Sequence, residues 1–252
     1  MTKRGSDQVG FILMDGFDLL GTSTEMEDNV EAFLQEGHTF GDDWTKQLYT
    51  GVKKATFSQG GWYDDASASS NQALSGQEGV SRSLCYGIEG NVIGRGFIGY
   101  NGAMQVNYTR IASRGELHRA NSAYEGNGQV DIGKILHPHI KMIGNGNTEA
   151  TPVTNAAGRT TAGGIGYLQV SQLDLKDHTS VTVTIRQSDD GGTTWGNLQA
   201  FTAITSVMAV DRIAERIVVT GDVEEDLAVS VAFAGGAAAD AEITFMVGFA
   251  RN

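Results

Sequence analysis

The sequence predicts a mainly β protein with antiparallel sheets, and three observations carry that prediction. The chain of 252 residues contains 34 glycines but only 2 prolines, and aromatic residues make up 8% of it. Its apolar segments are short and alternate with polar residues, which is typical of strands with one buried face. Glycine turns separate these segments about every 8 to 12 residues, as in antiparallel sandwiches and barrels.

The first predicted domain covers residues 1–143 and forms a sandwich or barrel. Its clearest strand is 52–59, VKKATFSQ, which alternates over its whole length. Turns are expected at Asp15-Gly16, Glu89-Gly90-Asn91 and Asn101-Gly102. Further strands are expected at 9–14, 83–88, 92–100, 104–112, 117–124 and 130–135.

Two segments of this domain are ambiguous. Between residues 22 and 36, Met26, Val30, Phe33 and Leu34 recur at helical spacing, and Thr24 with Glu27 could form a capping box. A strand is the alternative there. Residues 66–79 are small and polar, which predicts a surface loop or a short helix.

A linker is predicted at 144–164, because this stretch is rich in glycine, asparagine and threonine and nearly free of large apolar residues. The second predicted domain, 165–252, is a small β-sandwich that is expected to fold alone. Its alternating segments are 167–173, 180–188, 198–204, 215–221, 227–234 and 242–250.

Charge and cysteine content restrict the function. The formal net charge is −12, so the chain is not expected to hold nucleic acid by neutralising phosphates. The single cysteine, Cys85, excludes an intramolecular disulfide and is expected in a buried strand position. The N-terminal residues do not read as a signal peptide, and no segment has the apolar length of a membrane span. These features predict a protein that stays in, or is assembled in, a cytoplasm without membrane contact.

The stretch 40–65, FGDDWTKQLYTGVKKATFSQGGWYDD, carries a family resemblance together with MDGFDLLGT at 14–22. Both resemble the tube domain of major tail proteins of long-tailed, siphovirus-like bacteriophages. The resemblance implies a virion structural protein of the phage tail that stacks in hexameric rings, contacts other tail proteins and lets DNA pass through the lumen. It also favours a strand within 22–36. The closing FAR of the last strand resembles C-terminal virion modules of jelly-roll or immunoglobulin-like type.

Residues 188–195, SDDGGTTW, match the Asp-box of sialidases and related propellers through Ser188, Asp190, Gly192, Thr194 and Trp195. We interpret the motif as a structural hairpin turn, with the aspartate capping turn amides and the tryptophan pinning the hairpin. Carbohydrate contact is the alternative. The motif occurs once and lacks the arginine cluster of sialidase chemistry, so an enzyme is not expected.

No catalytic, cofactor-binding or metal site is predicted. His137 and His139 flank Pro138 and are interpreted as a strand end or linker start. His118 is expected on a strand, and His38 and His178 in loops. The glycines 87, 90, 94, 96 and 99 are interpreted as strand glycines, since they lack a phosphate-loop ending. The acidic pairs Asp42-Asp43, Asp64-Asp65 and Asp189-Asp190 are expected in turns, without acid–base roles.

Basic residues concentrate in the middle of the first domain, whereas residues up to 43 contain ten carboxylates against two basic residues. The two regions could pair across subunits of a ring, or the basic residues could lie on solvated strand faces. The basic set is Lys53, Lys54, Arg82, Arg95, Arg110, Arg114 and Arg119. Two other functions stay open: a capsid decoration, cement or neck protein, and a carbohydrate-binding sandwich.

Overall fold

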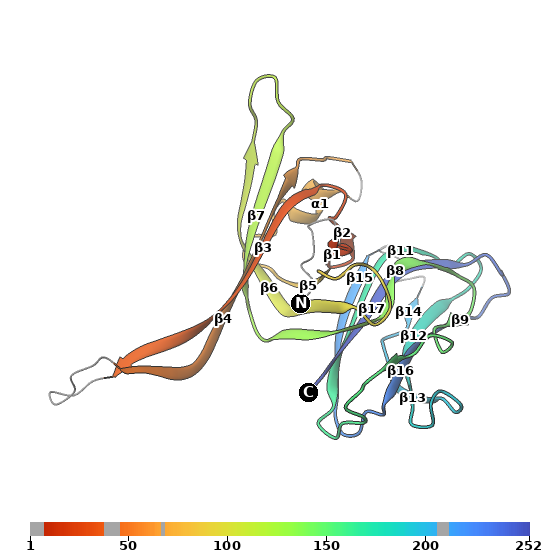
Figure 1. The fold of residues 1–252 in the computed structure, drawn as a ribbon. Helices are drawn as coiled ribbons and strands as arrows, with labels where there is room; N and C mark the ends of the chain where they lie inside the picture. The colour runs from red at the N-terminus through yellow and green to blue at the C-terminus, as the bar shows by residue number, and fades with distance from the viewer. Residues whose placement is uncertain (1–7, 38–45, 67–68, 206–211) are drawn as a thin grey trace.

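The computed structural model describes residues 8–37, 46–66, 69–205 and 212–252. Antiparallel strands dominate these residues, as predicted, with one short helix (Figure 1). The first half contains β1 (Phe11–Met14), β2 (Phe17–Asp18), β3 (Ser23–Gly37), β4 (Lys46–Trp62), α1 (Ser70–Leu74), β5 (Ser81–Gly87), β6 (Gly96–Ile111), β7 (Arg119–Gly126) and β8 (Val130–Ile143). The second half contains β9 (Gly146–Asn147), β10 (Val153–Thr154), β11 (Gly164–Asp174), β12 (Ser180–Ser188), β13 (Gly196–Ala200), β14 (Ile204–Thr205), β15 (Ile213–Val219), β16 (Asp226–Ala234) and β17 (Glu242–Arg251).

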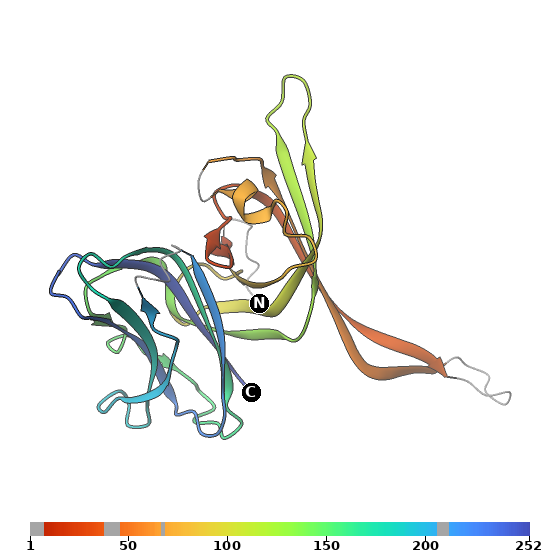
Figure 2. The same ribbon diagram turned by 180° about the vertical axis from the view of Figure 1, so that it is seen from behind.

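One 11-stranded sheet runs through both halves of the chain. Its order is β15-β11-β17-β8-β6-β5-β1-β2, and β7, β4 and β3 branch from the far part of β6. The branch curls around α1, as Figures 1 and 2 show from opposite sides. A second sheet of six short and long strands, centred on β16 and β12, covers β11, β17 and β8. The second half is therefore a β-sandwich in which one of the two sheets includes β8 of the first half.

Three apolar clusters make up the core. The largest fills the sandwich, and a second lies inside the curled branch around Phe57, Tyr86 and Tyr100. The third joins the halves, because β5 alternates: Leu84 and Tyr86 face the curled branch, whereas Cys85 faces Tyr167 and Met246 of the second half. Cys85 is fully buried, as predicted, and burial raises the pKa of its thiol.

The ambiguous segment 22–36 is a strand, β3, and residues 70–74 form a helix, so the short-helix alternative holds there. The predicted turn at Asn101-Gly102 is wrong, because both residues lie inside the continuous strand β6. A bulge next to this point lets β6 pair with β5, β7 and β8 along its length. The predicted strand 198–204 is split into β13 and β14.

Three local expectations need correction. Pro138 lies within β8 rather than at a strand end. It is accommodated because the pairing with β17 shifts register there and the pairing with β6 has ended at Lys134. Gly90 and Gly94 adopt positive φ in a loop between strands, so the glycine series is not wholly within strands. The segment 144–164 contributes β9 and β10 to the second sheet; the division into domains stays a prediction.

Candidate assembly surfaces

A two-stranded arm projects from the body of the molecule. We define the arm as residues 29–37 of β3 and 46–54 of β4, whose pairing includes Glu31 with Lys54 and Leu34 with Tyr49. Figures 1 and 2 show that it extends away from the second half. Val30 is 48% exposed and Leu34 is 57% exposed. In the described part of the chain, β3 pairs only with β4, so its outer edge is open.

The sheet formed by β3, β4 and β7 has one apolar and one polar face. The register places Asp28 opposite Phe57 and Tyr124, on the buried side. The other side, which we call the polar face, carries Glu25, Glu27, Lys54, Ser58, Asn121 and Glu125. The strand period of two in this region therefore separates a core from a wettable wall.

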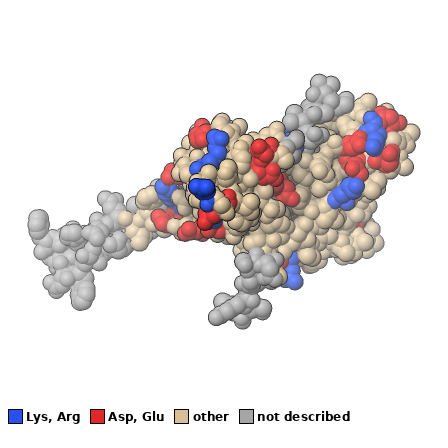
Figure 3. Space-filling model, turned by 90° about the horizontal axis from the view of Figure 1, so that it is seen from above, with Lys and Arg blue, Asp and Glu red and all other residues tan. Residues whose placement is uncertain are grey.

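Ion pairs cross the polar face between neighbouring strands. Lys54 Nζ lies 2.7 Å from Glu125 Oε1, and Arg119 lies 3.2 Å from Glu25 Oε1. Glu125 raises the pKa of Lys54 by hydrogen bonding and charge. Figure 3 shows basic and acidic side chains interspersed on the upper surface of the body rather than separated into patches. These members of the predicted basic cluster thus have partners within the same chain.

A groove of about 660 Å³ lies where β6 and β8 pass the open end of the sandwich. Its apolar lining includes Ile88, Ile98, Ile132, Val153, Leu227 and Phe249. Ile132 is 75% exposed, more than any other large apolar side chain among the described residues. Two charged groups of the lining have partners: Arg251 donates to the carbonyls of Val223, Glu224 and Glu225, and Glu89 accepts from Gly96 N.

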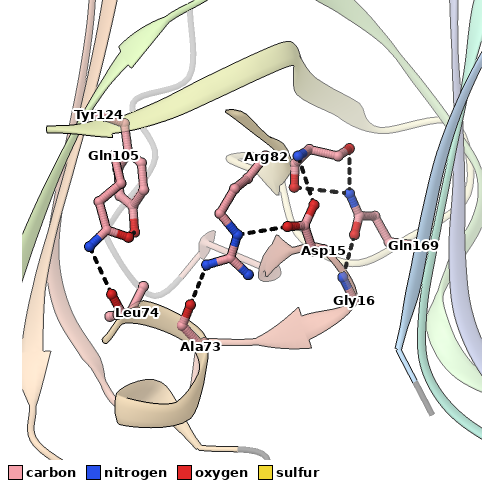
Figure 4. Close-up of polar contacts among 9 residues, drawn as sticks. Asp15, Gly16, Ala73, Leu74, Arg82, Gln105, Tyr124 and Gln169 are labelled. Atoms are coloured by element: carbon pink, nitrogen blue, oxygen red, sulfur yellow. Dashed lines mark hydrogen bonds and ion pairs between the residues drawn. The ribbon is translucent and has the colours of Figure 1, made fainter. Parts of the chain in front are cut away.

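Buried polar side chains connect the N-terminal turn to both halves (Figure 4). Arg82 Nε donates to Asp15 Oδ2 at 2.6 Å, and the same guanidinium donates to the carbonyl of Ala73 in α1. Gln169 of β11 accepts from Gly16 N at 2.7 Å and donates to Ser83 Oγ at 2.8 Å. Since every one of these groups has a partner, the cluster is built to hold the halves together.

Asp18, His139 and Ser171 lie in the order of a charge relay, but their hydrogen bonds do not fit nucleophile activation. His139 Nε2 is 2.8 Å from Ser171 Oγ, and that hydroxyl itself donates to the carbonyl of Thr244. Nε2 must therefore be the donor to Ser171 and is not free to take its proton. Asp18 stays 3.7 Å from Nδ1, beyond hydrogen-bond distance. The arrangement is a structural bridge.

The other histidines have structural surroundings. His137 stacks on Phe245 with ring centroids 4.0 Å apart, and burial lowers its pKa to about 4. His178 Nε2 contacts the carbonyl of Ala238 at 2.9 Å. Contrary to the prediction, His118 does not lie on a strand but is exposed in the loop just before β7. His38, Asp42 and Asp43 lie outside the described residues. Within the described ranges, no cluster of three or more His, Cys, Asp or Glu side chains could hold a metal ion.

The Asp-box forms the predicted turn between β12 and β13. Asp190 Oδ1 accepts from the amides of Thr193 at 2.9 Å and Thr194 at 2.8 Å and from Ser188 Oγ at 2.7 Å. These bonds lower the pKa of Asp190 to about 2. Trp195 Nε1 donates to the carbonyl of Gly192 at 3.0 Å, so the indole is held by its own turn. The hairpin interpretation is confirmed at the level of the turn geometry.

The surface residues that stand out are Val30, Leu34 and Ile132, and sequence reasoning singled out none of them for a surface role. The helical alternative for residues 22–36 places Val30 and Leu34 on one helix face, and Ile132 belongs to the predicted strand 130–135. In the strand β3, Val30 and Leu34 have no core to face, because the arm extends beyond the body. No helix in the described part of the chain is long and apolar enough to cross a membrane.

Comparison with known proteins gave likenesses of structure only. No protein-family model matches the chain, and no curated protein matches its sequence. Among solved structures, the chain is similar to one from the virion of a native gene transfer agent particle, with 13% identity, a TM-score of 0.43 and coverage of 52% of this chain and 98% of that one. A chain from the tail of an empty gene transfer agent particle with C6 symmetry gives 14% identity, a TM-score of 0.41 and coverage of 51% and 97%.

The Dit protein of phage SPP1, described as a paradigm of the hub adsorption apparatus in phages that infect Gram-positive bacteria, gives 10% identity. Its TM-score is 0.31, with coverage of 95% of this chain and 98% of that one. Each of these three is a likeness of structure at low sequence identity.

Proposed function

We propose that this chain is a structural protein of a phage virion, the major tail tube subunit, which assembles into stacked hexameric rings that conduct DNA. The role is passive rather than enzymatic. The ring and the hexameric number come from the sequence resemblance of residues 14–22 and 40–65. The subunits would assemble in the host cytoplasm and remain in the virion, in contact with other tail proteins.

The arm is the observation that carries the proposal. A two-stranded hairpin on its own is marginally stable in water, and an open edge strand invites pairing with another chain. Here the arm also leaves Val30 and Leu34 about half exposed, and burying the remainder would be favourable by about 1 kcal/mol each. A monomer with such an element is incomplete, whereas an assembly covers it.

The ends of the 11-stranded sheet support a head-to-tail assembly. One open edge is β3, and another is β15, which pairs only with β11 in the described part of the chain. Contacts between unlike surfaces of identical subunits close into a ring or continue as a filament. A tube of stacked rings uses both kinds of contact.

The polar face suits the wall of a conduit for DNA. Its basic residues Lys54 and Arg119 are paired with carboxylates within the chain, so they are not available to hold phosphates. The net charge of −12 per subunit repels the DNA backbone. We propose that this face lines the lumen and lets DNA slide without adhering.

Negative-stain electron microscopy of the full chain at rising concentration tests this function. Hollow tubes or stacked rings with a central hole are expected. Leu34→Asp should abolish them. Ile143→Asp also introduces a carboxylate at a side chain that is 57% exposed, but on β8, and it should leave them intact. Monomers that never assemble but bind a preformed capsid shell would instead identify a decoration protein and overturn the tube function.

A further inference from the structure

We infer that the arm contains a joint at the point where Phe33 of β3 passes an interruption in β4. The joint divides the arm into a proximal part, residues 29–32 and 53–54, and a distal part, residues 34–37 and 46–49. The distal part changes its angle to the body, whereas the proximal part keeps its place. Such a joint lets the distal part fit the surface of a neighbouring copy. That use rests on the proposed function, whereas the joint itself belongs to the single chain.

The pairing between the two strands of the arm is not continuous. It jumps from Ala32 opposite Lys53 to Leu34 opposite Tyr49. One residue of β3 therefore faces three residues of β4, 50–52. Two surplus residues in one strand break the ladder and bend that strand locally. Figures 1 and 2 show β4 bowed away from β3 along the arm.

Gly51, the middle one of the three residues, gives the joint its conformational freedom. Its φ is 82°, in the left-handed region that glycine adopts without steric cost. Apart from its neighbours in sequence, no heavy atom of the described chain lies within 4 Å of the position where a side chain would begin. The backbone angles of Gly51 are therefore not fixed by packing against other described residues.

The proximal part is attached to the body on both of its faces. On the apolar side, the hydroxyl of Tyr100, which is 1% exposed, donates to the carboxylate of Asp28 just before the arm begins. On the polar face, Lys54 Nζ lies 2.7 Å from Glu125 Oε1, and the pairing of β7 with β4 ends at Glu125 opposite Thr56. These attachments hold the arm up to Lys54, directly before the interruption.

The distal part has a regular ladder of its own. Its pairs run without a break from Leu34 opposite Tyr49 to Gly37 opposite Lys46. Along this length, neither strand pairs with any other strand of the described residues. Two regular ladders separated by a short irregular segment move as two units about that segment, which is the arrangement of a hinge.

Distances between two spin labels in one chain test the inference. One label is at Ile143→Cys on β8, and the other is at Glu36→Cys in the distal part or at Val30→Cys in the proximal part, while the buried Cys85 stays unlabelled. Residue 36 lies about 10 Å beyond Phe33 at strand spacing, so each change of about 20° at the joint moves it by about 3–4 Å. The distance distribution to residue 36 should therefore be at least about 3 Å wider than the distribution to residue 30 in pulsed electron paramagnetic resonance. Dilution with unlabelled chain restricts the measurement to distances within one copy.

Deletion of Thr50 and Gly51 tests the cause of the motion. The deletion leaves Phe33 opposite Val52 and makes the ladder continuous, while every pair of the distal part is retained. The distribution to residue 36 should then narrow to the width found for residue 30. The matched control is deletion of residues 115–116, an exposed glycine and its exposed neighbour in the loop between β6 and β7, which should leave the distribution wide.

Equal widths for residues 30 and 36 in the arm without the deletion would overturn the joint, and this comparison does not depend on the folding of the deletion variant. A distribution that stays wide in a folded deletion variant would overturn it as well. Because the distances are measured within single copies, neither result bears on whether tubes form in electron microscopy. A wide distribution in chains that never form tubes would support the joint and count against the tube function alone.

Discussion

At the scale of single residues, Arg82 is the most informative side chain. It is 5% exposed, and its guanidinium contacts Asp15 and the carbonyl of Ala73, so it ties the N-terminal turn to α1. We expect Arg82→Met to lower the free energy of unfolding by about 3 kcal/mol, because it leaves a buried carbonyl and a half-buried carboxylate without their donor. Urea denaturation followed by fluorescence measures this loss.

Arg159→Met is the matched control. Arg159 also pairs with a carboxylate, Asp222, at 2.5 Å, but both side chains are about half exposed. Its loss should change stability by less than about 1 kcal/mol. Equal effects of the two substitutions would show that the Arg82 contacts add no more than a surface ion pair does.

At the scale of elements, the Asp-box hairpin gives a prediction for pH. The folded-state pKa of Asp190, about 2, lies below its ordinary value of 3.8, so the ionised carboxylate stabilises the fold above pH 3.8. This stabilisation is lost as the pH falls from 3.8 through 2. Asp190→Asn should therefore lower the thermal midpoint at pH 7 and flatten its dependence on pH between 4 and 2. Asp189→Asn, the same change at the exposed neighbour, should do neither in melts followed by circular dichroism.

Strand period alone predicted most elements, and its failures have local causes. Asn101-Gly102 has the residues of a hairpin turn, yet β6 continues through both residues. Its pairing with β5 steps from Ala103 opposite Arg82 to Tyr100 opposite Leu84, so the two residues lie at a bulge instead of a turn. The spacing of Met26, Val30 and Phe33 fits a helix, but pairing with β4 makes the segment a strand. Pro138 predicted a strand end, but β8 continues through it. Next to it the Asn91 side chain takes the place of a neighbouring strand, because it donates to the carbonyl of His139 and accepts from the His139 N–H. Each outcome depends on a partner far along the chain.

At the scale of the whole molecule, the candidate surfaces could not be predicted from the sequence, because they too depend on residues that are far apart along the chain. The groove is assembled from residues around 88, 97, 133, 154, 227 and 250, and its existence depends on how β8 leaves the curled branch to enter the sandwich. Exposed apolar residues such as Ile132 alternate normally along their strands, so nothing local distinguishes them from core residues. Only the fold reveals which strand face is left uncovered.

The same architecture bears on the expected independence of residues 165–252. In the full chain, β17 pairs with β8 along most of its length, and Tyr167 Oη donates to the buried Asp131 of β8 at 2.5 Å. A fragment 165–252 would lose β8 and expose the edge of β17, and it would leave the Tyr167 hydroxyl without its acceptor Asp131 and Gln169 without Gly16 and Ser83. We therefore expect the fragment to show no cooperative thermal transition, while the full chain unfolds in a single transition by calorimetry. A fragment that melted cooperatively near the midpoint of the full chain would instead establish the sandwich as an independent domain, whose stability does not depend on pairing with β8.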